Sequence, residues 1–265
     1  MHKNGFFSLL FHALFVIFIV APLVVVMAMA FTSKGYLSLP TNGLSLRWFR
    51  ALADNHEMLD AFGLSIKLGL ASATIAALLA IPAALAISRY DFPGRGAVTG
   101  FLLSPLMIPS VVLGIAFLRF FSLAQIGGSF WALTLTHVIV VLPYALRLTL
   151  ASTIGLERDI EHAALSLGAS RWTAFYRVVL PRIRTGVVGG WMLAFIQSFD
   201  ELTMTVFVAT PGTTTLPVAM YNQISQTIDP LITAVSTVLI VGTLLLMLIL
   251  DRMVGLDRVL IGEGK

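Results

Sequence analysis

Residues Leu231–Leu250 read LITAVSTVLIVGTLLLMLIL and contain no charged side chain. Asp229-Pro230 precedes this run, and Asp251-Arg252 follows it. At a rise of about 1.5 Å per residue, a helix of this length covers about 30 Å, the thickness of the hydrocarbon core of a bilayer. The stretch therefore predicts a transmembrane helix, and it decides the class of fold.

The rest of the chain has the same character. Of its 265 residues, 58% are hydrophobic and 11% are charged, whereas a soluble domain carries about 25% charged residues. Backbone groups in lipid must bond within their own segment, and no alternating pattern suggests a barrel. The sequence predicts an all-α integral membrane protein, a single domain with six transmembrane helices at about 9–31, 64–88, 97–119, 129–150, 184–210 and 231–251.

The first apolar run has an alternative interpretation. Lys3, the run itself and AMAF at Ala28–Phe31 imitate a secretory signal with an A-x-A cleavage site. The run from Ala13 to Ala30 is longer than the h-region of about 7 to 15 residues in such signals, so an uncleaved helix is favoured. Cleavage would leave five spans.

The third span carries Pro105 and Pro109 within LLSPLMIPSVVLG (Leu102–Gly114). Proline removes a helical hydrogen bond and is tolerated in a membrane helix where neighbouring groups replace it. The sequence therefore predicts that this span is bent or locally unwound. The pattern is compatible with a pore-lining break and with a packing kink.

Lys and Arg gather on the cytoplasmic side of short membrane loops. If the N-terminus is cytoplasmic, the inner segments hold twelve of the 17 basic residues: Lys3, Arg89, Arg95, Arg147, Arg158, Arg171, Arg177, Arg182, Arg184, Arg252, Arg258 and Lys265. The outer segments hold Lys34, Arg47, Arg50, Lys67 and Arg119. Both termini are therefore predicted to be cytoplasmic, and the basic charge is explained without a nucleic-acid partner.

The chain has no cysteine, so disulfides and thiolate metal sites are excluded. HEML at His56 lacks the second histidine of a zinc-protease helix. His12 and His137, in or near apolar spans, are interpreted as packing residues. We expect no catalytic residue, metal site or cofactor in this chain. No phosphate-binding loop occurs, so any ATP must be bound by another polypeptide.

The inner segment 151–181 contains the least apolar helix of the chain, IEHAALSLGASRW at Ile160–Trp172. Asp159 and Glu161 lie near its predicted start, where carboxylates favour the helix dipole, and Gly168 ends it. An amphipathic connector on the membrane surface is the simpler interpretation. The narrow apolar edge of Ala163, Ala164, Leu167 and Ala169 instead favours close approach to a partner protein.

The order of residues in this segment resembles the EAA motif of membrane subunits of bacterial ATP-binding-cassette (ABC) importers. Ala163-Ala164, Gly168 and Leu180-Pro181 match the motif in register, whereas His162 stands at the glutamate position, directly after Glu161. The resemblance implies the type I importer permease (MetI-like) fold and a cytoplasmic coupling helix that contacts the ATPase subunit. Its contact residues would be Glu161, His162, Ala163, Ala164, Leu167, Gly168, Ala169 and Arg171.

Because His162 stands where the motif has its glutamate, the salt bridge that this glutamate usually forms with the ATPase can be replaced in two ways. Glu161 supplies it one residue earlier, or the contact depends less on charge.

The last part of the chain resembles the spermidine/putrescine-type permeases of the same superfamily. The matching residues are Phe199-Asp200-Glu201, Pro211-Gly212, Thr215-Leu216-Pro217, Asp229-Pro230 and Ala234-Val235-Ser236-Thr237. The resemblance implies half of a pore in a bacterial inner membrane, for polyamines or a related cation. It also implies a second, different permease chain, two ATPase subunits that use ATP and Mg²⁺, and a solute-binding protein.

Asp200 and Glu201 are adjacent acids in the fifth span, and each costs about 2.5 to 3.5 kcal/mol at a helix centre unless it faces a wet or polar interior. Gln197 and Thr205 extend a polar stripe on the same helix. We predict that these four residues lie along the translocation path. Alternatively, one acid pairs with an arginine or caps a helix break.

Two other classes of protein would require features that this sequence lacks. A secondary transporter would show inverted repeats or paired broken helices, and an intramembrane enzyme would need a Ser-His or paired-aspartate arrangement; neither pattern is found. An ABC permease for another solute, such as an opine, an amino-acid derivative or a metal chelate, remains the alternative.

Overall fold

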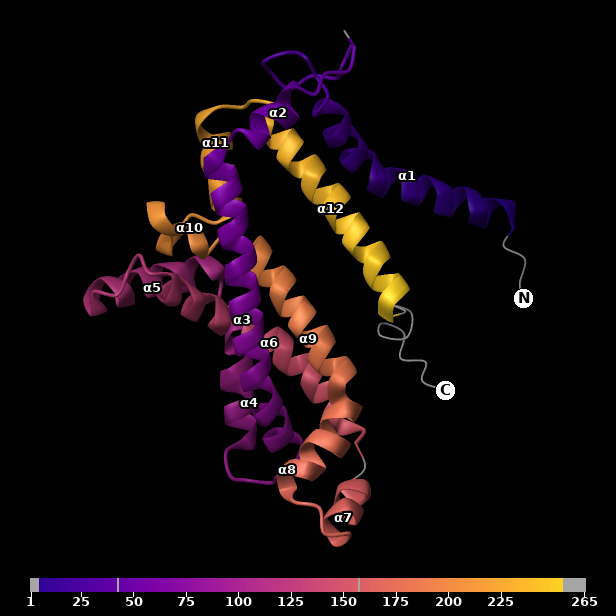
Figure 1. The fold of residues 1–265 in the computed structure, drawn as a ribbon, viewed down its shortest axis with the longest axis vertical. Coiled ribbons are helices and arrows are strands. Elements are labelled where there is room, and N and C mark those ends of the chain that lie inside the picture. The colour runs from indigo at the N-terminus through magenta and orange to yellow at the C-terminus, as the bar shows by residue number, and fades with distance from the viewer. Residues whose placement is uncertain (1–4, 42, 157, 255–265) are drawn as a thin grey trace. The chain divides into compact units, whose positions relative to one another are not determined.

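The computed structural model describes residues 5–41, 43–156 and 158–254, and within these ranges the chain is helical without strands (Figure 1). The all-α prediction is therefore confirmed. The helices are α1 Phe6–Met29, α2 Arg47–Ala53, α3 His56–Arg89, α4 Arg95–Leu103, α5 Ser110–Ala124, α6 Phe130–Ile154, α7 Arg158–Ser166, α8 Arg171–Ala174, α9 Leu180–Asp200, α10 Thr205–Val208, α11 Leu216–Gln226 and α12 Leu231–Val254.

The predicted spans can be compared with these helices. Among the described residues, four helices are long and apolar enough to cross a membrane: α1, α3, α6 and the continuous stretch Arg171–Asp200 that contains α9. A fifth span is present if the bent pair Arg95–Leu106 and Ser110–Ala124 is counted as one. The opening stretch forms α12, whose apolar part within the described residues is Leu231–Leu245.

The third predicted span is broken, as its two prolines indicated. Its two halves meet at an angle of 97°. Pro105 lies in a single 3₁₀ turn, and Pro109 precedes α5 with an extended ψ of 131°. Because Pro109 has no N–H and does not adopt the helical ψ, the helix stops and restarts there.

The fifth predicted span is shorter than the sequence indicated. The sequence predicts a span at 184–210 with an acidic interruption. In the structure, α9 ends at Asp200 and Glu201 is extended, with ψ 107°. A separate four-residue helix, α10, follows. The apolar character of Leu202–Thr210 suggested a continuing helix, but the backbone there is held by side chains of other helices, described below.

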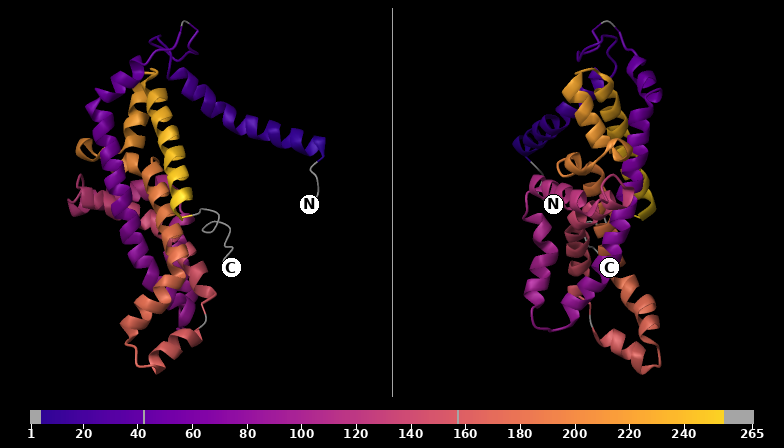
Figure 2. Two further views of the ribbon diagram at one scale, coloured as in Figure 1. Left: turned by 45° about the vertical axis from the view of Figure 1, so that its right-hand side comes forward. Right: turned by 90° about the vertical axis from the view of Figure 1, so that its left-hand side faces the viewer.

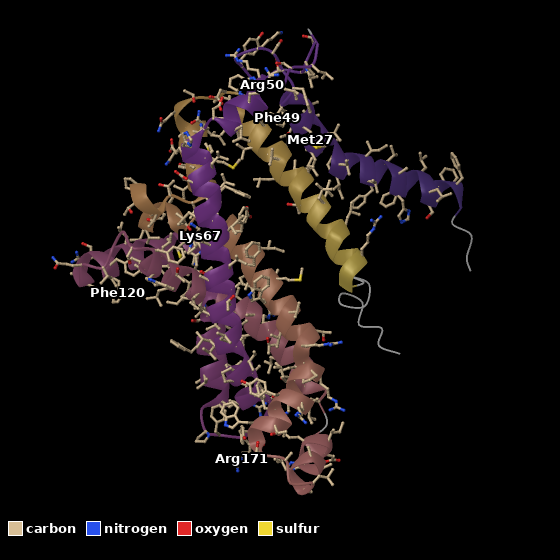
Figure 3. All side chains as sticks on the ribbon, viewed as in Figure 1. Met27, Phe49, Arg50, Lys67, Phe120 and Arg171 are labelled. Atoms are coloured by element: carbon tan, nitrogen blue, oxygen red, sulfur yellow. The ribbon has the colours of Figure 1, made fainter. Side chains whose placement is uncertain are left out.

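The chain divides into two compact units, residues 1–60 with 219–265 (unit 1) and residues 61–218 (unit 2). In unit 1 a small core joins α1, α2 and α12, with Ala30, Trp48, Leu231 and Ala234 buried together. The indole Nε1 of Trp48 donates to the Lys34 carbonyl at 3.2 Å. Figure 3 labels Phe49, Arg50 and Met27 in this part of the chain.

Unit 2 is built on the packing of α3, α6 and α9, of which α6 and α9 lie side by side (Figure 2). Its core is narrow because the facing residues are small, with Ala76, Ala80 and Ala84 of α3 against Val141 and Ala145 of α6. Small residues let membrane helices approach closely, which is how they associate without a hydrophobic driving force.

Candidate functional sites: the α7–α8 segment and the α9 break

The inner segment folds as a short helix, a reversal and a second helix. α7 has Asp159 and Glu161 in its first turn, which suits its dipole. It ends at Gly168, whose φ is +87°. The N–H of Gly168 donates to Leu165 O at 3.0 Å and that of Ala169 to Ala164 O at 3.1 Å. Such a glycine C-cap satisfies the last carbonyls of the helix and reverses the chain.

The second helix starts at once. Ser170 is the N-cap of α8, and its Oγ accepts the N–H of Thr173 at 3.1 Å. α8 continues through a single π turn, Phe175–Val179, into α9. α8, the π turn and α9 therefore form one nearly continuous helix from Arg171 to Asp200.

The predicted coupling residues are divided between two faces of this segment. His162, Ala163, Leu167, Gly168 and Arg171 are exposed, and Leu167 is 89% exposed. Ala164, Ala169 and Glu161 are half-buried. Figure 3 shows Arg171 at the end of unit 2 where α8 begins.

An aromatic pair extends the exposed face. Trp172 and Tyr176 are 73% and 59% exposed and stack with ring centroids 6.2 Å apart. The segment thus presents exposed apolar and aromatic side chains, with the exposed Arg171 and Arg177 on either side of the aromatic pair.

Glu161 has a partner within the chain. Its carboxylate forms an ion pair with the guanidinium of Arg89, the last residue of α3. The two side chains are only 25% and 16% exposed. The sequence did not indicate this pair, because Arg89 and Glu161 are 72 residues apart and the charge distribution identifies Arg89 only as an inner basic residue.

The two acids of the fifth span lie at the break between α9 and α10. Asp200 is exposed and, among the described residues, makes no side-chain hydrogen bond or ion pair. The Oε1 of Glu201 accepts the N–H of Met204 at 2.7 Å. Glu201 therefore caps the start of the next turn, one of the alternatives that the sequence left open. Gln197 is half-buried, one turn before Glu201.

A buried histidine holds both sides of this break. His137 of α6 is 1% exposed, and its ring nitrogens lie 2.8 Å from Ser198 Oγ and 3.1 Å from Thr205 Oγ1. Its interpretation as a packing residue agrees with this position, whereas His12 is exposed on α1. Thr205 is fully buried and faces His137.

The segment after the break also packs against α5. A Cβ added to Gly114 would come within 3.0 Å of the Met204 carbonyl oxygen. Because α5 and α6 both contact it, the break is a fixed feature of unit 2. Among the described residues no group of three or more His, Asp or Glu side chains is arranged to hold a metal ion.

We expect His137→Leu to lower the free energy of unfolding by about 2–4 kcal/mol, because two buried hydroxyls lose their partner. Thermal unfolding of the purified chain in detergent, followed by tryptophan fluorescence, measures the effect. His12→Leu is the control, since His12 is exposed and its hydrogen bonds are to Ser8 of the same helix. Equal unfolding midpoints for the two variants would contradict the role given to His137.

These features define a class of protein: a multi-pass helical membrane component with an exposed helical segment at one end of its main helical unit and a polar break in one span. The chain belongs to the family of binding-protein-dependent transport system inner membrane components, whose model matches residues 76–256. It is a transport subunit of the inner membrane rather than an enzyme, and such a transporter works with an ATPase and a solute-binding protein.

Individual relatives agree with the family. The spermidine/putrescine transport system permease protein PotC of Escherichia coli K12 is 28% identical over 256 residues, covering 97% of this chain and 94% of that protein. The putrescine transport system permease protein PotI of the same strain is 31% identical over 230 residues, covering 84% and 82%.

The fold is similar to that of a solved transporter. A chain in the crystal structure of a bacterial ABC transporter for import of the acidic polysaccharide alginate matches with a TM-score of 0.72 at 12% identity, covering 94% of this chain and 96% of that one. This likeness concerns the fold alone, and it agrees with the expected importer permease architecture.

Proposed function

We propose that this chain forms half of the pore of an ATP-driven polyamine importer, paired with a second, different permease and two ATPase subunits. Both termini would be cytoplasmic, as the distribution of Lys and Arg indicates. The ATPase subunits bind ATP and Mg²⁺, and this chain binds neither. The observation that carries the proposal is the exposed segment from α7 to α8, whose Leu167 and Trp172 face away from unit 2.

The proposed contact works through the shape of this segment. Association of the ATPase subunits on ATP would move both coupling helices, and α8 and α9 form a nearly continuous helix that carries this movement toward the break at Glu201. The exposed contact residues are His162, Ala163, Leu167, Gly168 and Arg171.

The charge at the break supports a cationic substrate. The C-terminal end of a helix carries the equivalent of about half a negative charge, so carboxylates there are unfavourable for stability. Asp200 is the last residue of α9 and Glu201 follows it. The end of the helix dipole, Asp200 and Glu201 therefore all contribute negative potential at the break. A positively charged polyamine would offset this potential. Gln197, Asp200, Glu201 and Thr205 are proposed to belong to the path, with Thr205 acting through His137.

The test of the function is reconstitution of this chain with its second permease, ATPase subunit and solute-binding protein in liposomes. Putrescine and spermidine should each stimulate ATP hydrolysis through the binding protein and be taken up. If uptake proceeds in the chain alone without ATP, the secondary-transporter alternative replaces this proposal. If hydrolysis is stimulated by neither polyamine but by another solute, the ABC permease stands and the substrate class is wrong.

Asp200→Asn and Glu201→Gln are expected to raise the half-saturating polyamine concentration by about tenfold each, since one charge near the path is worth roughly 1–2 kcal/mol. Glu201→Gln keeps an oxygen for the Met204 N–H, so the cap is retained while the charge is lost. Uptake in proteoliposomes measures the change. Asp91→Asn, whose side chain is 98% exposed, is the control and should leave uptake unchanged.

A further inference from the structure

The ion pair between Arg89 and Glu161 joins two elements that are far apart in the sequence. Arg89 ends α3, and Glu161 lies in the first turn of α7. Both belong to unit 2, and the views in Figure 2 agree that α7 lies at the same end of this unit as the loop from α3 to α4. The pair is therefore a direct link between α7 and a spanning helix, separate from the chain connection through α8.

The Arg89–Glu161 ion pair is partly buried. Both side chains are less than a third exposed, so the charges are less screened than in a surface pair. Because the Glu161 carboxylate is half-buried and already paired with Arg89, it is poorly placed to form a salt bridge with a second protein. The exposed residue at the motif position is His162, and the next exposed large side chain is Leu167. Of the two alternatives left open by the sequence, the pairing of Glu161 within the chain favours an ATPase contact that depends less on charge.

The other part of α3 within unit 2 contacts α9 beside the acidic break. Phe62 and Phe199 meet edge to face with ring centroids 6.1 Å apart. A Cβ on Gly69 would come within 2.9 Å of the Phe195 ring. Trp191 Nε1 donates to Thr74 Oγ1 at 3.0 Å. α3 thus holds α7 at one end and the residue before Asp200 toward the other.

We propose that Arg89 and Glu161 are positioning residues that transmit displacement of α7 through α3 to the α9 break, and that the ATPase contact of α7 uses the exposed face formed by His162 and Leu167. This inference rests on the proposed coupling role of α7. It adds a second route of transmission, in which the acid next to the motif acts inside the permease rather than across the subunit interface.

Charge exchange tests the pair. The variants are Arg89→Glu, Glu161→Arg and the double exchange, and the matched control is the Asp91–Arg95 pair. That pair is also in an inner segment, with Arg95 Nη1 2.8 Å from Asp91 Oδ1, but it is 98% and 42% exposed. Two readouts are taken: amide hydrogen exchange of residues 158–170 in the purified full chain, and stimulation of ATP hydrolysis by the polyamine-loaded binding protein in the assembled transporter.

Each single variant should raise exchange across α7 by about 3- to 10-fold, because a local opening is no longer opposed by the pair, and should lower stimulation by a similar factor. The double exchange should restore most of both. Exchange in α6 and α9 should not change, which shows that the variants fold. Arg95→Glu should alter neither readout.

The inference is overturned if the single variants leave α7 exchange and stimulation at the wild-type level, or if the double exchange fails to restore them. Loss of stimulation in Glu161→Arg that Arg89→Glu cannot correct would return Glu161 to the ATPase interface. A wild-type assembly without ATP-driven uptake instead contradicts the proposed function, so the two failures are distinguishable.

Discussion

Gly168→Val is expected to reduce stimulation of ATP hydrolysis and polyamine uptake by about tenfold. Gly168 ends α7 at a φ of +87°, and a residue with a Cβ pays roughly 1–2 kcal/mol there. A Cβ at this position would have no atom within 4 Å, so the expected effect comes from backbone strain. The strain would open the reversal between α7 and α8 and displace the exposed face that carries Leu167.

Two variants test whether the positive φ at Gly168 is the cause. Gly155→Val introduces the same side chain in the same inner region, also with no atom within 4 Å, but its φ is −87°. Gly168→Asn keeps a residue type that tolerates positive φ and should retain most of the stimulation. The explanation fails if Gly155→Val and Gly168→Val reduce coupling equally, since positive φ would then not be the cause.

Gly186→Ala is expected to lower the free energy of unfolding by about 3 kcal/mol. Gly186 of α9 faces α6, and an added Cβ would overlap Ser152 Oγ and lie 2.6 Å from the Leu148 carbonyl oxygen. The backbone oxygen cannot move without shifting α6. The two helices that carry His137 and the acidic break would therefore separate.

Gly189→Ala is the matched control on the same helix. Its nearest contact would be Leu148 Cδ1 at 3.7 Å, which is ordinary van der Waals contact. Thermal unfolding in detergent, followed by circular dichroism, should show a lower midpoint for Gly186→Ala and an almost unchanged one for Gly189→Ala. Comparable midpoints in the two variants would contradict the close packing of α6 and α9.

Much of the architecture could be predicted because the bilayer imposes a simple rule. Charge-free runs such as Leu231–Leu250 must be helices, and Pro105 and Pro109 must interrupt one. The inner segment was also recognisable, because Gly168 needs its backbone freedom whatever the surrounding fold. These features depend on residues that are close in the sequence.

The end of the fifth span was less predictable. Leu202–Thr210 is apolar enough to continue a helix, yet α9 ends at Asp200. The competing interactions come from elsewhere: the ring nitrogens of His137 in α6 and the close approach of the Met204 backbone to Gly114 in α5. Hydropathy measures transfer from water to lipid, and it contains no information on such distant partners.

By itself the sequence determined that the chain is a helical membrane protein with an inner segment that contains a helix ending at a glycine, since length, charge and local backbone preference are properties of short stretches. Only the tertiary structure decided what Glu161 and His137 do. Glu161 pairs with Arg89, and His137 joins Ser198 to Thr205. Each side chain could have bonded to many partners, and the packing of α3, α6, α7 and α9 selects one, because a half-buried charge or a buried imidazole is stable only where a partner is within reach.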